Sequence, residues 1–188
     1  MKYIKLSLFG FCLITLLSCN SQKSTVAQSE TTETEEVTAP TSQPEMLTGP
    51  TKRYELQTGT FGEWFNPFYA SYRVDESLVK EIKPLIKDVD ITLFMGTWCG
   101  DSKRETPRIY KIFDAVGKSE DVELITVDRS KTTPQGLEKG RDITRVPTLI
   151  LSKDGEELGR IVEYPIESLE ADMLKILKGE PYKHAYAD

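Results

Sequence analysis

The sequence predicts an α/β fold, with a central mixed sheet flanked by helices, in which parallel strands gain an antiparallel edge. The first observation is that short apolar runs alternate with segments of helical periodicity. The second is a hairpin signal, Lys153-Asp154-Gly155-Glu156, which joins the last two of these runs. Strands are expected at 91–95, 122–127, 146–151 and 158–162, and helices at 74–87, 102–116, 134–141 and 166–177.

The N-terminus has the features of a secretory signal. Two lysines precede the apolar stretch 6–17, which is too short to span a bilayer comfortably. It ends in Leu-Leu-Ser-Cys19, which resembles the lipobox of bacterial lipoproteins. The resemblance implies removal of a signal peptide, residues 1–18, and lipid on Cys19, whereas the plainer alternative is an ordinary signal peptide with a chance cysteine. We therefore expect a lipid anchor at a membrane of the bacterial cell envelope, with the folded part outside the cytoplasm, in the periplasmic space.

Residues 19–52 are predicted to be a disordered tether that begins at the lipidated cysteine. The stretch 20–50 is rich in Ser, Thr, Gln and Glu and contains no aromatic residue. It cannot bury enough apolar surface to offset the ordering of its backbone. Recognition by a partner is the alternative use of such a segment. A folded domain is expected at 53–188, with its core at 74–178.

An aromatic-rich extension opens the predicted domain. Its aromatic side chains recur at helical spacing, but Pro67 interrupts the pattern. We therefore expect a turn followed by a short helix with Asn66 as N-cap and Pro67 at its first position. The stripe predicts docking onto the domain core, and the alternative is a wall for an apolar substrate or a protein partner. The aromatic residues are Phe61, Trp64, Phe65, Phe68, Tyr69 and Tyr72.

The remaining elements follow from apolar periodicity and breaker residues. The helix at 74–87 starts at the capping residue Asp75, and Pro84 bends it or ends it early. The run 91–95 is a short buried strand that delivers Gly96-Thr97-Trp98-Cys99 at its carboxyl end, and the strand at 146–151 opens on a proline. The buried faces of the first and last helices are predicted to consist of Leu78, Val79, Ile82, Leu85 and Ile86, and of Ile166, Leu169, Met173, Leu174 and Leu177.

Charge and cysteine content narrow the function. The chain has 188 residues and a formal net charge of −6, and no basic stripe tracks phosphates, which argues against nucleic-acid binding. Of its three cysteines, Cys12 lies in the signal and Cys19 would carry lipid, so Cys99 is left as the one free thiol. No Cys/His cluster indicates a metal site within one chain, and no cofactor is expected. The only histidine, His184, could pair with Cys99 only if the end of the sequence folded back to it.

Cys99 is placed to act as a nucleophile. It lies between the end of a strand and the start of the helix expected at 102–116, where unpaired N–H groups and the helix dipole favour a thiolate. Lys103 and Arg104 add positive charge nearby, whereas Asp101 opposes ionisation. The alternative is an inert buried cysteine that serves as a small apolar residue.

Three motifs, in this order, resemble those of the thioredoxin family. They are Trp98-Cys99-Gly100-x-x-Lys103 with Pro107 eight residues after the cysteine, Val146-Pro147-Thr148, and the hairpin turn at 153–156. The resemblance covers about residues 74–178 and implies a thioredoxin-like three-layer sandwich with thiol–disulfide exchange at Cys99. It also implies a cis-proline at Pro147, facing Cys99, and a backbone at Val146 that pairs with an extended substrate. From the residues alone, Pro147 could equally open a strand in the trans form, and Trp98 could shield the thiol or cap the core.

Two residues depart from the family pattern. Ser102 occupies the position of the resolving cysteine, and Leu93 occupies the position where many thioredoxins keep a buried acid. The sequence thus keeps the attacking half of the exchange mechanism and lacks the resolving half. A hydroxyl at Ser102 could instead hydrogen-bond a thiolate at Cys99.

Together, the thioredoxin resemblance, these two departures and the lipobox predict a monothiol thiol–disulfide oxidoreductase of the cell envelope, with an external thiol or a partner protein resolving the mixed disulfide at Cys99. Its partners would be protein or small-molecule thiols and disulfides, with the membrane reached through the N-terminal lipid. The alternative is a non-catalytic binding module for extended or unfolded envelope proteins, which the changes at Ser102 and Leu93 favour. A further alternative is peroxide or thiol sensing through a sulfenic acid, but no peroxidase-type motif surrounds the cysteine.

Overall fold

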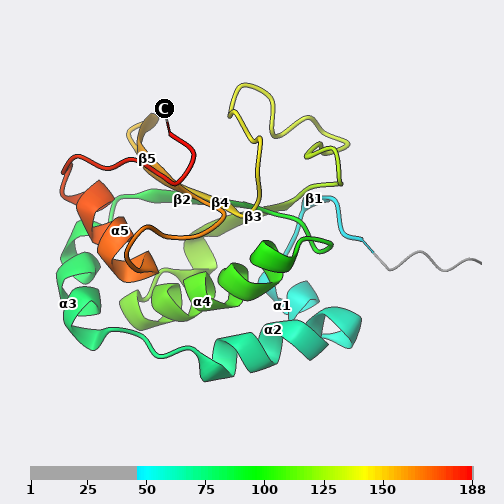
Figure 1. The fold of residues 1–188 in the computed structure, drawn as a ribbon, viewed down its shortest axis with the longest axis horizontal. Helices are drawn as coiled ribbons and strands as arrows, with labels where there is room; N and C mark the ends of the chain where they lie inside the picture. Colours follow the sequence, from blue (N-terminus) through cyan, green and yellow to red (C-terminus); the bar gives the residue numbers. More distant parts are fainter. Residues whose placement is uncertain (1–45, 188) are drawn as a thin grey trace, which may run out of the picture. The chain divides into compact units, whose positions relative to one another are not determined.

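A computed structural model describes residues 46–187, which form a five-stranded mixed sheet with helices packed against it (Figure 1). The strands lie in the order β1-β3-β2-β4-β5. β2 and β3 are parallel, and every other neighbouring pair is antiparallel. The predicted α/β class and mixed sheet are confirmed. The strands are β1 (Gly49–Pro50), β2 (Asp90–Met95), β3 (Val122–Thr126), β4 (Thr148–Lys153) and β5 (Glu156–Val162).

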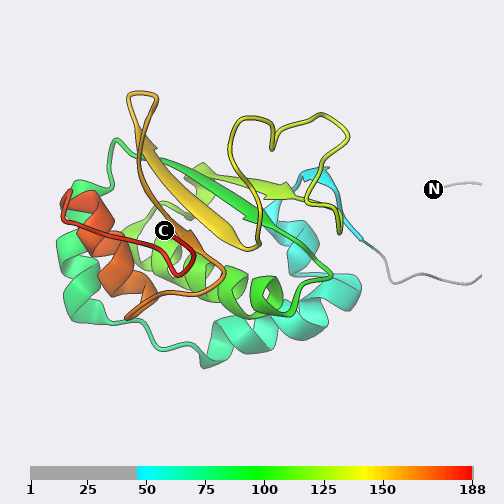
Figure 2. The same cartoon turned by 45° about the horizontal axis from the view of Figure 1, so that its top comes forward.

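The α-helices lie on one face of the sheet, and the connection 127–147 crosses the opposite face (Figures 1 and 2). The third layer of the predicted sandwich is thus a loop rather than a layer of helices. Beneath it lies a small group of buried apolar side chains, the loop-side cluster: Phe94, Ile125, Val127, Ile143, Val146 and Ile150. The helices are α1 (Arg53–Leu56), α2 (Gly59–Ser71), α3 (Glu76–Leu85), α4 (Gly100–Val116) and α5 (Leu169–Leu177), and a short 3-10 helix spans Ser119–Asp121.

The helix predicted at 134–141 is absent, so that prediction was wrong. This part of the chain forms turns. Gly136 has φ +70° and Gly140 has φ +76°, a left-handed conformation that interrupts a right-handed helix. Thr133 donates its hydroxyl to the Glu138 carboxylate at 2.8 Å, which closes one of the turns. The sheet face opposite the helices is therefore covered by turns whose shape depends on glycine and on local hydrogen bonds.

The aromatic segment docks on the core, as predicted, but its helix differs from the prediction. α2 starts well before Asn66 and runs unbroken through Pro67, so the turn and cap expected at these residues were wrong. Phe65 is fully buried and stacks on Tyr69, with ring centroids 6.2 Å apart. A proline removes one hydrogen bond from a helix interior, and burial of this aromatic face offsets that loss.

The helices expected from apolar periodicity at 74–87 and 166–177 are present as α3 and α5, with smaller corrections. Asp75 caps α3 through its side chain, as predicted. Leu85 was predicted to be buried but is exposed, because α3 ends there. Ile166 was also predicted to be buried and is exposed, because α5 begins only at Leu169.

The folded part begins before residue 53, where the tether was expected to end. In β1, Gly49 pairs with Thr126 of β3, and Pro50 pairs with the neighbouring residue of the same strand. The last residues of the expected tether therefore form an edge of the sheet. The predicted signal peptide, Cys19 and the tether up to residue 45 lie outside the described residues.

Candidate active site

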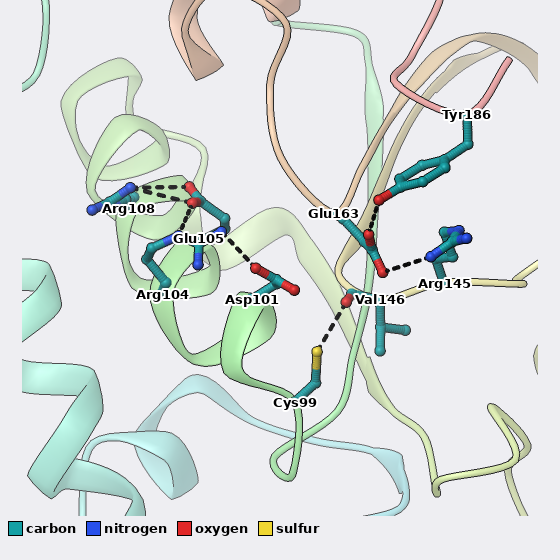
Figure 3. A network of polar contacts seen from close by, with 9 residues as sticks. All are labelled: Cys99, Asp101, Arg104, Glu105, Arg108, Arg145, Val146, Glu163 and Tyr186. Atoms are coloured by element: carbon teal, nitrogen blue, oxygen red, sulfur yellow. Dashed lines mark hydrogen bonds and ion pairs between the residues drawn. The ribbon is translucent and has the colours of Figure 1, made fainter.

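Cys99 is the N-cap residue of α4, which begins at Gly100 rather than at the predicted Ser102. Its backbone is extended (φ −89°, ψ 128°), and its N–H donates to Gly96 O at 2.9 Å. The side chain is partly exposed. Its thiol donates a hydrogen bond to the carbonyl oxygen of Val146 at 3.2 Å (Figure 3). The sulfur therefore lies at the positive end of a helix, with one defined polar neighbour.

The carbonyl that accepts this bond belongs to a firmly held segment. The Val146–Pro147 peptide bond is cis, the form that the resemblance implied, and Val146, Pro147 and Thr148 are all buried. Thr148 donates its hydroxyl to Arg145 O at 2.7 Å, and Glu163 N–H donates to Pro147 O at 2.7 Å. The polar contact that the thiol makes here is with the backbone, not with a side chain.

Trp98 packs on the loop-side cluster, next to the cysteine. Its ring Nε1–H donates to Val127 O at 2.9 Å, and the Arg129 guanidinium lies 5.4 Å from the ring centroid. A β-carbon at Gly96 would come within 2.7 Å of the ring. The indole is therefore fixed between the end of β2 and the connection 127–147, and Gly96 makes room for it.

Ser102 is hydrogen-bonded to the backbone and not to the thiol. It is fully buried, and its hydroxyl oxygen accepts the Gly96 N–H at 3.1 Å, which ties the first turn of α4 to the end of β2. The hydrogen bond to Cys99 that the sequence allowed is not formed. Leu93, at the position of the family's buried acid, is fully buried in the apolar core beneath the helices.

The charges expected to act on Cys99 largely satisfy one another along α4. Arg104 lies 2.6 Å from Asp101 and 2.6 Å from Glu105. Glu105 is buried despite its charge, and the arginine pairing compensates it. Lys103 is partly exposed on the same turn. Of the two positive side chains expected to act on Cys99, Arg104 is therefore engaged by carboxylates.

Three residues that the sequence did not single out border the site. Glu163, just after β5, lies between Arg145 and Tyr186 (Figure 3). The Arg145 guanidinium is 3.4 Å from its carboxylate, and the Tyr186 hydroxyl hydrogen-bonds the same group. No motif marks these residues. The one available signal was that Arg145 directly precedes Val146 in the sequence.

Other kinds of site are not formed within residues 46–187. His184 accepts the Tyr186 N–H at 3.2 Å, whereas Cys99 bonds Val146, so no Cys–His pair is present there. Burial and the charge of Arg160 lower the pKa of His184. In the same residues, no group of three or more His, Cys, Asp or Glu side chains could hold a metal ion, and no helix is long and apolar enough to cross a membrane.

Comparisons with known proteins bear on both the fold and the site. The family model described as Thioredoxin matches residues 73–175. The chain is 31% identical over 99 residues to mitochondrial thioredoxin-3 of Saccharomyces cerevisiae, covering 50% of this chain and 74% of that protein. It is 30% identical over 96 residues to a thioredoxin of Staphylococcus haemolyticus, covering 50% of this chain and 86% of that protein. A solved structure of a Pseudomonas aeruginosa protein of unknown function aligns with a TM-score of 0.52 at 16% identity, over 70% of this chain and 93% of that one, which bears on the fold alone.

Proposed function

The chain belongs to the thioredoxin family, and we propose that it exchanges thiols and disulfides through one nucleophile, Cys99, with an external thiol completing each turnover. The family match and the thioredoxin relatives assign it a thiol–disulfide redox role in general terms. The narrower proposal is a monothiol oxidoreductase. Its substrates would be protein or small-molecule disulfides, and the resolving thiol would belong to a second molecule.

One observation carries the proposal: the two positions of the family's paired cysteines have different environments here. Cys99 is the partly exposed N-cap of α4, and its sulfur meets the Val146 carbonyl. Ser102 is fully buried, and its hydroxyl is engaged by the Gly96 N–H. A hydroxyl does not attack a disulfide at neutral pH, because only a thiolate is nucleophilic enough. This supports attack from within the chain and resolution from outside it.

The proposed reaction has two steps. In the first, the Cys99 thiolate attacks one sulfur of the substrate disulfide; a new S–S bond forms, the substrate's own S–S bond breaks, and the departing thiolate takes a proton from water. In the second, the thiolate of an external thiol attacks the substrate sulfur of the mixed disulfide. Cys99 leaves as a thiolate, and the external thiol is now joined to that half of the substrate. The N-terminus of α4 directs its N–H groups and positive dipole end toward the sulfur in both steps.

The test compares the native chain with Cys99→Ser and Ser102→Cys. Turnover of a peptide mixed disulfide is measured with glutathione as the external thiol. Native turnover is expected to rise with glutathione concentration and to be lost in Cys99→Ser, because no other group attacks the disulfide. Ser102→Cys is expected to release the substrate thiol in a single turnover without glutathione, because its second thiol attacks the mixed disulfide and forms an internal disulfide; further turnovers then need glutathione to reduce that disulfide. A native rate no higher than that of Cys99→Ser would refute the enzyme proposal.

A binding module for extended or unfolded proteins is the second candidate, and Leu93 favours it. This residue is fully buried in a packed apolar core, so the family's proton-moving acid is missing as well as the second cysteine. A binding module predicts that Ser102→Cys gains no reductase activity. It also predicts that a cysteine-free extended peptide binds equally well to the native chain and to Cys99→Ser, which equilibrium titration measures.

We further propose that lipid on Cys19 anchors the protein at an envelope membrane, with the domain in the periplasmic space. The support comes from the sequence: two lysines, the apolar stretch 6–17 and the motif Leu-Leu-Ser-Cys19. Several acyl chains hold a protein at a membrane more firmly than one chain does. In cells grown with labelled palmitate, the native chain and Cys12→Ala are expected to take up label. Cys19→Ala should take up none and should move to the soluble fraction, and label retained by Cys19→Ala would contradict the proposal.

A further inference from the structure

Glu163 directly follows β5 and is bonded to residues 145–148, which we call the cis-proline segment. Its N–H donates to Pro147 O at 2.7 Å. Its backbone has φ +62°, a left-handed conformation that residues with side chains rarely adopt. Glycine adopts this conformation at lower cost. A glutamate here therefore points to a use for its side chain.

The carboxylate of Glu163 reaches the cis-proline segment a second time. It lies 3.4 Å from Arg145 Nη1 and accepts a hydrogen bond from the Tyr186 hydroxyl. The side chain is only 17% exposed, so these contacts are partly shielded from water. One residue thus holds the segment on both sides of Val146, whose carbonyl accepts the thiol hydrogen bond of Cys99 (Figure 3).

Tyr186 joins the segment 180–187 to this arrangement. Its ring centroid is 3.8 Å from the Arg145 guanidinium, and it packs edge-on against Tyr164 with centroids 6.0 Å apart. The Tyr186 hydroxyl donates to the Glu163 carboxylate, and this hydrogen bond raises the pKa of the hydroxyl. The ring and the hydroxyl therefore restrain Arg145 and Glu163 together.

We propose that Glu163 is a positioning residue for exchange at Cys99, and that Tyr186 holds the Glu163 carboxylate against Arg145. The inference rests on the proposed function, because it assigns this arrangement to presenting the cis-proline segment to a peptide substrate. An extended peptide needs both the thiol and the backbone beside it, whereas a small disulfide needs the thiol alone. Loosening the segment therefore slows exchange with peptides more than exchange with small disulfides.

The test measures second-order rate constants of full-length variants with two substrates. One is an extended peptide that carries a mixed disulfide, and the other is the small uncharged disulfide of mercaptoethanol. Glu163→Ala is expected to slow the peptide reaction about tenfold and the small-disulfide reaction by less than about twofold. Glu163→Gln keeps the side-chain length and an acceptor for Tyr186, so it should recover most of the peptide rate. Both variants keep a β-carbon at φ +62°, so the backbone strain at this position is the same in both.

Variants of Tyr186 test the same contact from a different segment. Tyr186→Ala removes the ring and the hydroxyl and should slow the peptide reaction as Glu163→Ala does. Tyr186→Phe keeps the ring on Arg145 and should give an intermediate rate. Glu157→Ala is the matched control, because Glu157 lies near the start of β5 and pairs with Arg160 at 2.6 Å. It should react with both substrates at the native rate.

The outcomes separate this inference from the proposed function. If Glu163→Ala and Tyr186→Ala react with the peptide as fast as Glu157→Ala does, the inference is wrong. Equal slowing with both substrates would also overturn it. A native chain that reacts with neither substrate faster than Cys99→Ser would overturn the proposed function instead. If Glu163→Ala does not fold, the two Tyr186 variants decide the question, because Tyr186 lies outside the sheet.

Discussion

The two faces of the sheet are covered in different ways. On the helix-covered face, side chains from all five α-helices and from four strands pack into one large cluster, which includes Phe65, Ile112 and Met173. On the loop-covered face, the loop-side cluster has six buried apolar side chains among the described residues. Trp98 and Cys99 pack against this smaller cluster. The site therefore lies beside the less heavily packed face.

This difference separates the residues that stabilise the domain from the residues that position the reactive thiol. The connection 127–147 is held by local hydrogen bonds: Asp128 accepts the N–H groups of Ser130 at 2.8 Å and Thr132 at 2.9 Å. It contributes Val127, Ile143 and Val146 to the loop-side cluster. Functional residues commonly lie on loops that a rigid scaffold positions. Here β2 and α4 are the scaffold, and the connection supplies the segment that faces the thiol.

Truncating one buried side chain on each face gives the largest expected effect. Phe113→Ala, on the helix-covered face, should lower the free energy of unfolding by about 3–5 kcal/mol, because the packed helices cannot close the cavity. Ile143→Ala, in the loop-side cluster, should lower it by about 2 kcal/mol, because the loop can settle into the space. The rate constant for exchange with a peptide disulfide should fall only in Ile143→Ala. Urea titrations and rate constants measured well below each unfolding midpoint check this, and equal losses of stability in the two variants would mean that the two faces contribute alike.

The sequence predicted the helix-covered face well because that face is made of periodic elements. Val79 and Ile82 are buried at the helical spacing, and the run 91–95 forms the central strand β2. The errors occurred where the local preference of a residue and the tertiary packing favour different structures. Pro67 suggested a helix start, but the burial of Phe65 keeps α2 continuous through it.

The site could be predicted only in part. The place of Cys99 between the end of a strand and the start of a helix followed from the local pattern. Pro147 as its neighbour followed only from the family resemblance, because the two residues lie far apart in the sequence. The positions of Glu163 and Tyr186 could not be predicted in this way, because they reach Arg145 through the ends of β5 and the segment 180–187. The turns at 134–141, where a short helix was predicted, were missed because Gly136 and Gly140 adopt left-handed backbone.

Ser102 ties the first turn of α4 to Gly96 at the end of β2, so removing its hydroxyl tests whether this contact serves stability or chemistry. Ser102→Ala leaves the buried Gly96 N–H without its acceptor and should lower the free energy of unfolding by about 1–3 kcal/mol. Exchange at Cys99 should stay within about twofold of the native rate, because the hydroxyl is hydrogen-bonded to Gly96 and the thiol to Val146. Ser102→Thr, which keeps a hydroxyl, is the matched control. A slower exchange rate with an unchanged free energy of unfolding would mean that the hydroxyl contributes to the reaction at Cys99.

A smaller change is expected in acid stability, which depends on contacts of the helix-covered face. Asp114 of α4 accepts two hydrogen bonds from Arg53, each at 2.7 Å, and one from the Tyr69 hydroxyl at 2.6 Å. Burial alone would raise the pKa of this carboxyl, but these bonds outweigh burial and leave the pKa below its ordinary value. A carboxyl whose pKa is lowered by folding adds stability above its unfolded pKa of about 3.9, and that stability is lost as the pH falls through the folded value.

Asp114→Asn should therefore lower the free energy of unfolding by about 1 kcal/mol at neutral pH and make it less dependent on pH below about pH 4. Urea titrations at a series of pH values measure both effects. The pH dependence of peptide exchange should match that of the native chain, because Asp114 ties α4 to α1 and α2 on the face away from the connection 127–147. A shifted exchange profile would mean that the helix-covered face also tunes the thiol, and the separation of stability from chemistry would not hold.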